Sequence, residues 1–483
     1  MKKKMILIFI LKLFIKNKMK YSKEIFKELI LILLIQYIIT ATEDDLVKSI
    51  PDYDYKGRLY SGYLDVSEVK KFHYMFNYAH EDPENKPLVL WFNGGPGCSS
   101  LDGWANEHGP MQMGTDGSFH LNEYSWNRAA NMIYLESPGD VGFSYIDSKL
   151  DYELYINDDI AANDNLQALL SFFKKFPSMK NKDFYISGES YGGIYVPMLA
   201  YNIVQYNKNL PESQKIRLKG ILVGNGVADW NYDADYAMID FAFTHHLYSY
   251  ETRMDFNKYC IMEYDALKCN EIIDIIEQNL DGINVYDYLR ECAVPQTKNG
   301  EISYNSKYYK YARWAFKNKK VSKYNKDLPL KESNDVPCFD DSNVEKYFNR
   351  KDVQTALHVE ARTEWTICSD PVYDRYESQD KGSVWTYPTL IKEGIRILIY
   401  SGDTDAVVPF NGNQIWIRNL NLEIEKPWRQ WRAFEDQDNV SGYVIKYSGL
   451  TFCTIKGTGH MAPQWKPKES YYMFSKFLND EEF

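Results

Sequence analysis

Short, largely apolar runs recur along the chain, and each ends in a loop rich in glycine or acidic residues. They lie at residues 88–92, 132–135, 184–186, 221–223, 395–400 and 451–455. Unbroken runs of this length are typical of strands buried on both faces, as in a parallel sheet. Segments with helical spacing, such as residues 159–173, fall between them. The pattern predicts an α/β fold with a mostly parallel central sheet, helices on both faces, and active-site residues just after the strands.

Residues 230–340 break this rhythm, because they hold few strand-like runs and four of the seven cysteines. We interpret them as a cap subdomain inserted into a core formed by residues 42–229 and 341–483. The basic, tyrosine-rich tract at residues 307–331 is expected to be a solvated loop rather than a binding patch.

The first 41 residues differ from the rest of the chain. Lysines precede two apolar runs, residues 5–15 and 29–39, and small residues follow the second run. This order is typical of a signal peptide, here residues 1–41, and Met19 is an alternative start that leaves one ordinary signal. The alternative is an uncleaved membrane anchor, although each run is short for a bilayer span. After cleavage we expect no stable membrane association.

The net charge and the spacing of the cysteines indicate which ligands the protein is not expected to bind. The formal net charge is −11, and the predicted signal segment is itself basic, so the remainder should not bind nucleic acid. No two cysteines form a CxxC pair, which gives no sign of a zinc or redox site, and we expect no metal and no cofactor. In a secreted chain the cysteines indicate disulfides with one thiol left over. An N-glycosylation sequon at residues 439–441 fits the same route.

A candidate nucleophile lies in the turn at residues 188–192, which reads Gly-Glu-Ser-Tyr-Gly. An apolar run precedes this turn and another, residues 194–204, follows it. Strand, sharp glycine turn and helix together form a nucleophile elbow, which holds the Ser190 hydroxyl above a sheet. The alternative, an ordinary serine in a glycine-rich turn, is disfavoured by this context.

A serine nucleophile needs a neutral imidazole as base and a carboxylate to orient it, in the chain order Ser, Asp, His for this fold. The histidines that follow Ser190 are His245, His246, His358 and His460. Only His460 follows a late strand and a glycine loop. Asp403 and Asp405 both lie on the preceding strand end. We assign Asp405 as the acid, and we expect Asp403 to orient the turn.

The loop at residues 93–97, Asn-Gly-Gly-Pro-Gly, follows another strand. Its glycines let backbone N–H groups approach a developing oxyanion. The expected donors are the N–H groups of Gly95 and of Tyr191, which directly follows the nucleophile. Taken alone, this loop is also consistent with a plain Gly-Pro turn.

Together these motifs resemble the serine carboxypeptidases, the family of carboxypeptidase Y, plant carboxypeptidases and lysosomal protective protein (cathepsin A). The matching segments are residues 60–64, 91–100, 136–145, 188–193, 401–405 and 459–460, in family order. The resemblance implies an α/β-hydrolase fold and a serine-type carboxypeptidase that acts at acidic pH. It also implies peptide or protein substrates with a free C-terminus.

The resemblance further implies that Asn93, Glu107 and Glu189 bind the C-terminal carboxylate of the substrate. An amide donor and a carboxyl that keeps its proton are both able to hold a carboxylate. Because two neighbouring glutamates do not both ionise easily, at least one pKa should rise.

Cysteine pairing is implied in the same way. The family pattern pairs Cys98 with Cys368, and it suggests Cys260–Cys269 and Cys292–Cys338 as bridges of the cap. Cys453 is then left as a buried core thiol.

Two other functions stay open at this level. Plant relatives with the same triad transfer acyl groups to metabolites, and the lysosomal relative also stabilises other hydrolases. The sequence predicts the secretory pathway, and it does not decide between a lysosome or vacuole and secretion, or whether the protein forms a homodimer.

Overall fold

The computed structural model describes residues 43–148, 154–233, 235–280, 282–291, 341–359, 364–434 and 439–483. The predicted signal segment, the basic tract at residues 307–331 and the suggested Cys292–Cys338 bridge lie outside these ranges. Within them, no helix is long and apolar enough to cross a bilayer.

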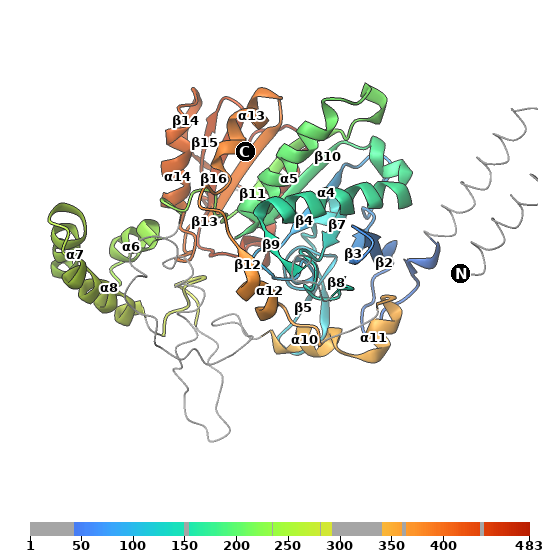
Figure 1. Ribbon diagram of the computed structural model, residues 1–483, viewed down its shortest axis with the longest axis horizontal. Coiled ribbons are helices and arrows are strands. Elements are labelled where there is room, and N and C mark those ends of the chain that lie inside the picture. The colour runs from blue at the N-terminus through green and yellow to red at the C-terminus, as the bar shows by residue number, and fades with distance from the viewer. Residues whose placement is uncertain are drawn as a thin grey trace, which may run out of the picture.

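A single large sheet runs through the molecule, in the strand order β1-β2-β3-β7-β4-β10-β11-β13-β16-β15-β14 (Figure 1). Its six central strands are all parallel to their neighbours within this group. They are β7 (Asn131–Leu135), β4 (Leu88–Phe92), β10 (Phe184–Glu189), β11 (Leu218–Gly224), β13 (Arg396–Gly402) and β16 (Leu450–Ile455). These are the six strands that the apolar runs predict, so the mostly parallel sheet is confirmed.

Antiparallel strands extend the sheet at both ends. They are β1 (Leu46–Val47), β2 (Leu59–Asp65), β3 (Lys70–Asn77) and β8 (Tyr145–Ile146) at one end, and β15 (Gly442–Tyr447) and β14 (Ile424–Trp431) at the other. The outermost β14 is largely exposed, with mixed polar and apolar residues. Sequence reasoning missed these strands because polar residues interrupt their apolar positions.

Alternate residues of the central strands enter two separate apolar cores, one on each face of the sheet. Leu90, Ile186 and Ile399 belong to the first core. Trp91 and Tyr400 belong to the second. Because both faces are covered, the strands need apolar side chains at nearly every position.

Helices cover both faces. On the first face α4 (Asp158–Lys175) packs against α5 (Gly192–Asn207), and α5 contacts α13 (Tyr387–Lys392). On the second face, α10 (Ser342–Phe348), α11 (Lys351–Ala356) and α16 (Pro467–Leu478) contribute residues to the second core. Helix α4 begins where the Asn157 side chain accepts a hydrogen bond from Ile160 N at 2.9 Å. Further elements are β5 (Met111–Met113), β6 (Phe119–Leu121), β9 (Ile156–Asn157), β12 (Tyr376–Glu377), α12 (Asp370–Arg375), α14 (Phe410–Asn419) and α15 (Ala462–Trp465).

The described part of the 230–340 segment lies to one side of the sheet (Figure 1). It contains α6 (Asp235–Thr244), α7 (Tyr250–Phe256) and α8 (Ala266–Leu280), which share a small apolar cluster of their own. Cys260 and Cys269 form the predicted disulfide there. The exact bounds of a cap subdomain stay a prediction.

Candidate active site

The predicted nucleophile lies in a sharp turn between β10 and α5. Ser190 has a φ of 58°, a left-handed conformation that a non-glycine residue adopts only when its surroundings enforce it. Ser190 N donates to Gly224 O at 3.1 Å, and Ser190 O accepts from Gly193 N and Val227 N, each at 3.0 Å. The strand–turn–helix arrangement is therefore confirmed, and the turn is fixed from the neighbouring strand. The Ser190 side chain is half-buried.

Asp405 and His460, from loops that follow β13 and β16, meet in the structure. His460 Nδ1 lies 2.7 Å from Asp405 Oδ2, and both residues are buried. The carboxylate fixes the imidazole so that Nε2 is the nitrogen left to act on a hydroxyl. Among the described residues, His460 Nε2 is buried without a hydrogen-bond partner, so it is not yet bonded to Ser190 Oγ. Such catalytic hydrogen bonds often tighten only when substrate binds.

Asn225, which the sequence reasoning passed over, joins the nucleophile turn to the acid. Its Nδ2 donates to Asp405 Oδ2 at 2.8 Å, and its Oδ1 accepts from Gly402 N at 2.9 Å. The preceding residue, Gly224, is the one whose carbonyl binds Ser190 N. The only signal in the sequence is that Asn225 follows the apolar run at residues 221–223. Its contact with Asp405 is visible only once β11 and β13 lie side by side.

A segment beyond α8 holds the acid and base loops together. Tyr286 O accepts from His460 N at 2.8 Å, and the Tyr286 ring meets the imidazole edge to face at 5.1 Å. One residue further, Asp287 accepts a 2.6 Å hydrogen bond from Thr404 Oγ1, next to Asp405. This distal segment carries no motif, so sequence reasoning did not connect it with the site.

Three other candidates of the sequence analysis, Asp403, His245 and His358, bond to backbone groups instead. Asp403 Oδ1 accepts from Gly457 N at 2.6 Å and so fixes the glycine loop before His460, as expected. His245 and His358 bond to backbone carbonyl groups, those of Phe241 and Ser61, at 2.8 and 3.2 Å.

The predicted oxyanion loop lies directly against the nucleophile turn. A Cβ atom at Gly94 would overlap Tyr191 N and lie 2.6 Å from Ser190 Cβ, so only glycine permits this approach. Gly95 follows with a φ of 109°. The Tyr191 side chain is fixed separately, because its hydroxyl donates to Asp158 Oδ1 at 2.7 Å. The structure thus brings Gly94, which directly precedes the expected donor Gly95, against the backbone nitrogen of the other expected donor, Tyr191.

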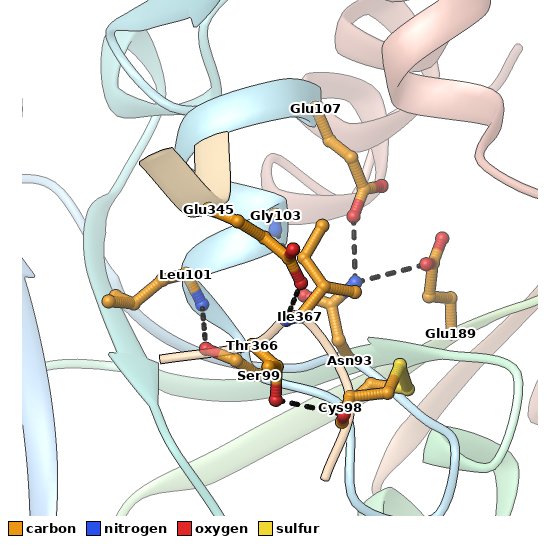
Figure 2. The surroundings of a disulfide bond; sticks show 11 residues. Asn93, Cys98, Ser99, Leu101, Gly103, Glu107, Glu189, Glu345, Thr366 and Ile367 are labelled. Atoms are coloured by element: carbon orange, nitrogen blue, oxygen red, sulfur yellow. Dashed lines mark hydrogen bonds between the residues drawn. A yellow bond between two sulfur atoms is a disulfide. The ribbon is translucent and has the colours of Figure 1, made fainter. Parts of the chain in front are cut away.

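Asn93, Glu107 and Glu189 form one buried cluster beside the nucleophile turn (Figure 2). Asn93 Nδ2 donates to Glu107 Oε1 at 2.9 Å and to Glu189 Oε1 at 3.1 Å. The Asn93 Oδ1 atom accepts from Trp91 Nε1 at 2.7 Å, which fixes the orientation of the amide. The second carboxyl oxygens of both glutamates are buried without a hydrogen-bond partner among the described residues.

The two carboxyls hold their protons unusually strongly. Burial, and next the charge of Asp102, raise the pKa of Glu107 to about 8. Burial, followed by the charges of Glu107 and Asp102, raises the pKa of Glu189 well above its usual range. Asp102, half-buried and with a pKa raised to about 6 by burial, is a neighbour that the sequence did not suggest. Near neutral pH the cluster can therefore donate hydrogen bonds to a bound carboxylate.

The predicted disulfide between Cys98 and Cys368 is confirmed and lies beside this cluster (Figure 2). The segments around it form two backbone hydrogen bonds, Ser99 N to Ile367 O at 2.7 Å and Ser369 N to Gly97 O at 2.9 Å. They anchor the oxyanion loop to the second half of the core. Cys453 is a free buried thiol, as expected. Within the described residues, no group of histidine, cysteine and acidic side chains is arranged to hold a metal ion.

Comparisons with known proteins agree with this geometry. A model of the serine carboxypeptidase family matches residues 51–480. Serine carboxypeptidase 24 of Arabidopsis thaliana is 35% identical over 453 residues, covering 91% of this chain and 93% of that protein. Serine carboxypeptidase-like 26 of Oryza sativa subsp. japonica is 35% identical over 437 residues, covering 87% of each.

Among solved structures, the chain is similar to Kex1(delta)p, a prohormone-processing carboxypeptidase from Saccharomyces cerevisiae. The TM-score is 0.68 at 22% identity, and the match covers 91% of this chain and 96% of that one. At this identity the likeness speaks for the fold, and it confirms the expected α/β-hydrolase class.

Proposed function

Because this chain belongs to the serine carboxypeptidase family, we propose that it removes C-terminal amino acids from peptides and proteins at acidic pH. The observation that carries the proposal is the Asn93 amide held between two carboxyls, Glu107 and Glu189, that keep their protons. Glu189 directly precedes Ser190 in the turn. A group that binds a free carboxylate is therefore one residue from the nucleophile.

In the proposed reaction Ser190 Oγ attacks the carbonyl carbon of the last peptide bond, and His460 Nε2 takes the hydroxyl proton. The N–H groups of Gly95 and Tyr191 receive the oxyanion. His460 then donates the proton to the leaving amine, the C–N bond breaks, and the shortened peptide stays as an ester on Ser190. Water, deprotonated by His460, hydrolyses this ester and restores the hydroxyl.

The carboxyl cluster favours substrate binding at acidic to neutral pH over alkaline pH. A substrate carboxylate brings a further negative charge to a site that already holds two carboxyls. Its binding requires the pair to stay protonated, and the proton on Glu107 is lost as the pH rises through the pKa of that carboxyl, about 8. The KM for free-acid peptides should therefore rise at alkaline pH. Two disulfides fit the oxidising secretory pathway. An acidic lysosome or vacuole, or secretion into an acidic medium, suits the same preference.

The test compares a blocked dipeptide that has a free C-terminal carboxylate with its C-terminal amide, in the wild type and in Glu189→Gln. At pH 5 the wild type should release the terminal amino acid from the free acid. Glu189→Gln should raise the KM for the free acid at least tenfold and change the KM for the amide much less. Equal effects on both substrates would refute the role of the cluster.

The competing activity is acyl transfer or ester hydrolysis. It predicts turnover of an acyl ester with an alcohol acceptor and no release of amino acids from the free-acid dipeptide. That result would replace the carboxypeptidase proposal.

A further inference from the structure

A residue outside this cluster lies on the same row of the sheet as Glu189. In the parallel register Glu189 pairs with Gly224 of β11, and Gly224 pairs with Tyr400 of β13. Side chains that pair across parallel strands point to the same face. Tyr400 belongs to the second core, so Glu189 and Tyr400 both point to that face, with a glycine between them.

The missing side chain at Gly224 makes room for the Tyr400 phenol. A Cβ atom at Gly224 would lie 2.5 Å from Tyr400 Oη and would overlap the ring carbon that carries it. The phenol oxygen therefore lies over Gly224, one strand spacing of about 4.8 Å from the strand that carries Glu189. An alanine at position 224 would occupy this space.

Both facing groups have an unfilled hydrogen bond. Tyr400 Oη and Glu189 Oε2 are buried, and each has no partner among the residues that the structure describes. After burial, the charges of Glu189 and then Glu107 are the largest causes that raise the pKa of Tyr400. A buried phenol donor without an acceptor and a buried carboxyl without a second donor cost free energy separately. The two groups are not hydrogen-bonded to each other in this structure, but they share a row of the sheet, so a change of side-chain rotamer can let each satisfy the other.

Burial of an unpartnered phenol does not by itself indicate a role, because Tyr387 on α13 is also buried with an unpartnered hydroxyl. Tyr387 packs against Trp416 in the first core, on the opposite face of the sheet. The two tyrosines differ in position. The register of the sheet puts Tyr400 on the same row as Glu189, whereas Tyr387 lies on helix α13, away from the carboxyl pair. Tyr387 is therefore a matched control.

We propose that Tyr400 is a positioning residue of the carboxylate-binding cluster, whose hydroxyl turns to donate to the Glu189 carboxyl once that carboxyl ionises, and so sets the pH above which the substrate carboxylate is released. This rests on the proposed function. The titratable groups that face Glu189 are Glu107 and Asp102 from the segment before β5 and Tyr400 from β13. Tyr134 on β7 faces Glu107, and the Cys453 thiol on β16 faces Tyr400. A donor to the ionised carboxyl stabilises that form, so its loss lets the pair keep its proton to higher pH.

The experiment measures KM and kcat from pH 5 to 9 for the free-acid dipeptide and its amide, in Tyr400→Phe and Tyr387→Phe. Tyr400→Phe should move the alkaline rise of KM for the free acid upward by about one pH unit. It should change the KM for the amide much less. Tyr387→Phe should move neither. In a Glu189→Gln background, Tyr400→Phe should cause no further shift. A KM profile of Tyr400→Phe identical to that of the wild type would overturn the inference.

A second measurement separates this inference from the proposed function. Infrared titration of protonated carboxyl groups, without substrate, compares the wild type with both phenylalanine variants. An upward shift in Tyr400→Phe alone supports the hydrogen bond even if the wild type releases no amino acid. No shift overturns it even if the carboxypeptidase activity is present.

Discussion

Two clusters among the described residues pair a buried histidine with a carboxylate and a serine, and the two differ in whether the imidazole keeps a free nitrogen. At the candidate site His460 Nδ1 lies 2.7 Å from Asp405. In the core, His73 Nδ1 lies 2.8 Å from Glu136, and His73 Nε2 lies 2.9 Å from Ser61 Oγ. By residue type and distance alone, the cluster of Ser61, His73 and Glu136 looks the more complete triad.

The two clusters differ in their surroundings. Ser61 Oγ donates to Leu357 O at 2.6 Å, and Glu136 accepts from Trp365 Nε1 at 2.9 Å and from Ser99. Ser61, His73 and Glu136 are fully buried. In contrast, Ser190 is half-buried in a strained turn, and His460 Nε2 has no partner among the described residues. A cluster whose hydrogen bonds are all made within the core stabilises the fold. A cluster with a free imidazole nitrogen and an accessible hydroxyl can react.

The largest expected effect comes from the two serines. Ser190→Ala should lower kcat by about six orders of magnitude, because it removes the attacking atom. Ser61→Ala should leave kcat within about threefold of the wild type and lower the unfolding free energy by about 1–3 kcal/mol, because His73 Nε2 then lacks its partner. Steady-state kinetics and denaturant titration measure both. A large loss of kcat in folded Ser61→Ala would erase the distinction.

Substitutions of the two carboxylates, Asp405 and Glu136, should likewise affect different quantities, kcat for the first and the unfolding free energy for the second. Asp405→Asn should keep the fold and lower kcat about 10⁴-fold, because the amide favours the wrong imidazole tautomer. Glu136→Gln should lower the unfolding free energy by about 3–5 kcal/mol, since it breaks a buried pair with His73, while the folded enzyme keeps its kcat. Thermal unfolding and active-site titration of the folded fraction distinguish the two. Strong destabilisation by Asp405→Asn with kcat retained would contradict the assignment.

Asn225 should matter less than either carboxylate. Asn225→Ala removes one donor to Asp405 and the acceptor of Gly402 N. A hydrogen bond to a charged group is worth about 1.5–3 kcal/mol, so kcat should fall about 10- to 100-fold with KM nearly constant. An unchanged kcat would show that Asp405 is held without Asn225.

The smallest expected effect is the pH dependence of stability. Glu107 has a pKa near 4.5 when unfolded and about 8 when folded, so the unfolded state ionises first as the pH rises. Its stabilising contribution is complete below about pH 4.5 and is lost as the pH rises through about 8. Glu107→Gln removes this loss, so its Tm should fall less between pH 5 and 8 than that of the wild type, by roughly 2 °C. Parallel Tm profiles would argue against a proton held on Glu107.

The sequence predicts the centre of the sheet and the Ser190 turn well, because unbroken apolar runs and a strand–glycine–helix pattern have few other solutions. It misses β2, β3, β14 and β15, where polar residues interrupt the apolar pattern. It also misses contacts between distant segments, such as Asn225 with Asp405. Tyr286 and Tyr400 carry no motif and are recognised only through the register of the sheet and the packing of loops.

The most direct test is to label the protein with a fluorophosphonate and to map the modified residue by peptide mass spectrometry. The account predicts one adduct, on Ser190, because its hydroxyl is accessible and the imidazole of His460 has a free nitrogen. It predicts no adduct on Ser61, whose hydroxyl is buried and already bonded to Leu357 O. An adduct on Ser61, or labelling that persists in Ser190→Ala, would contradict it.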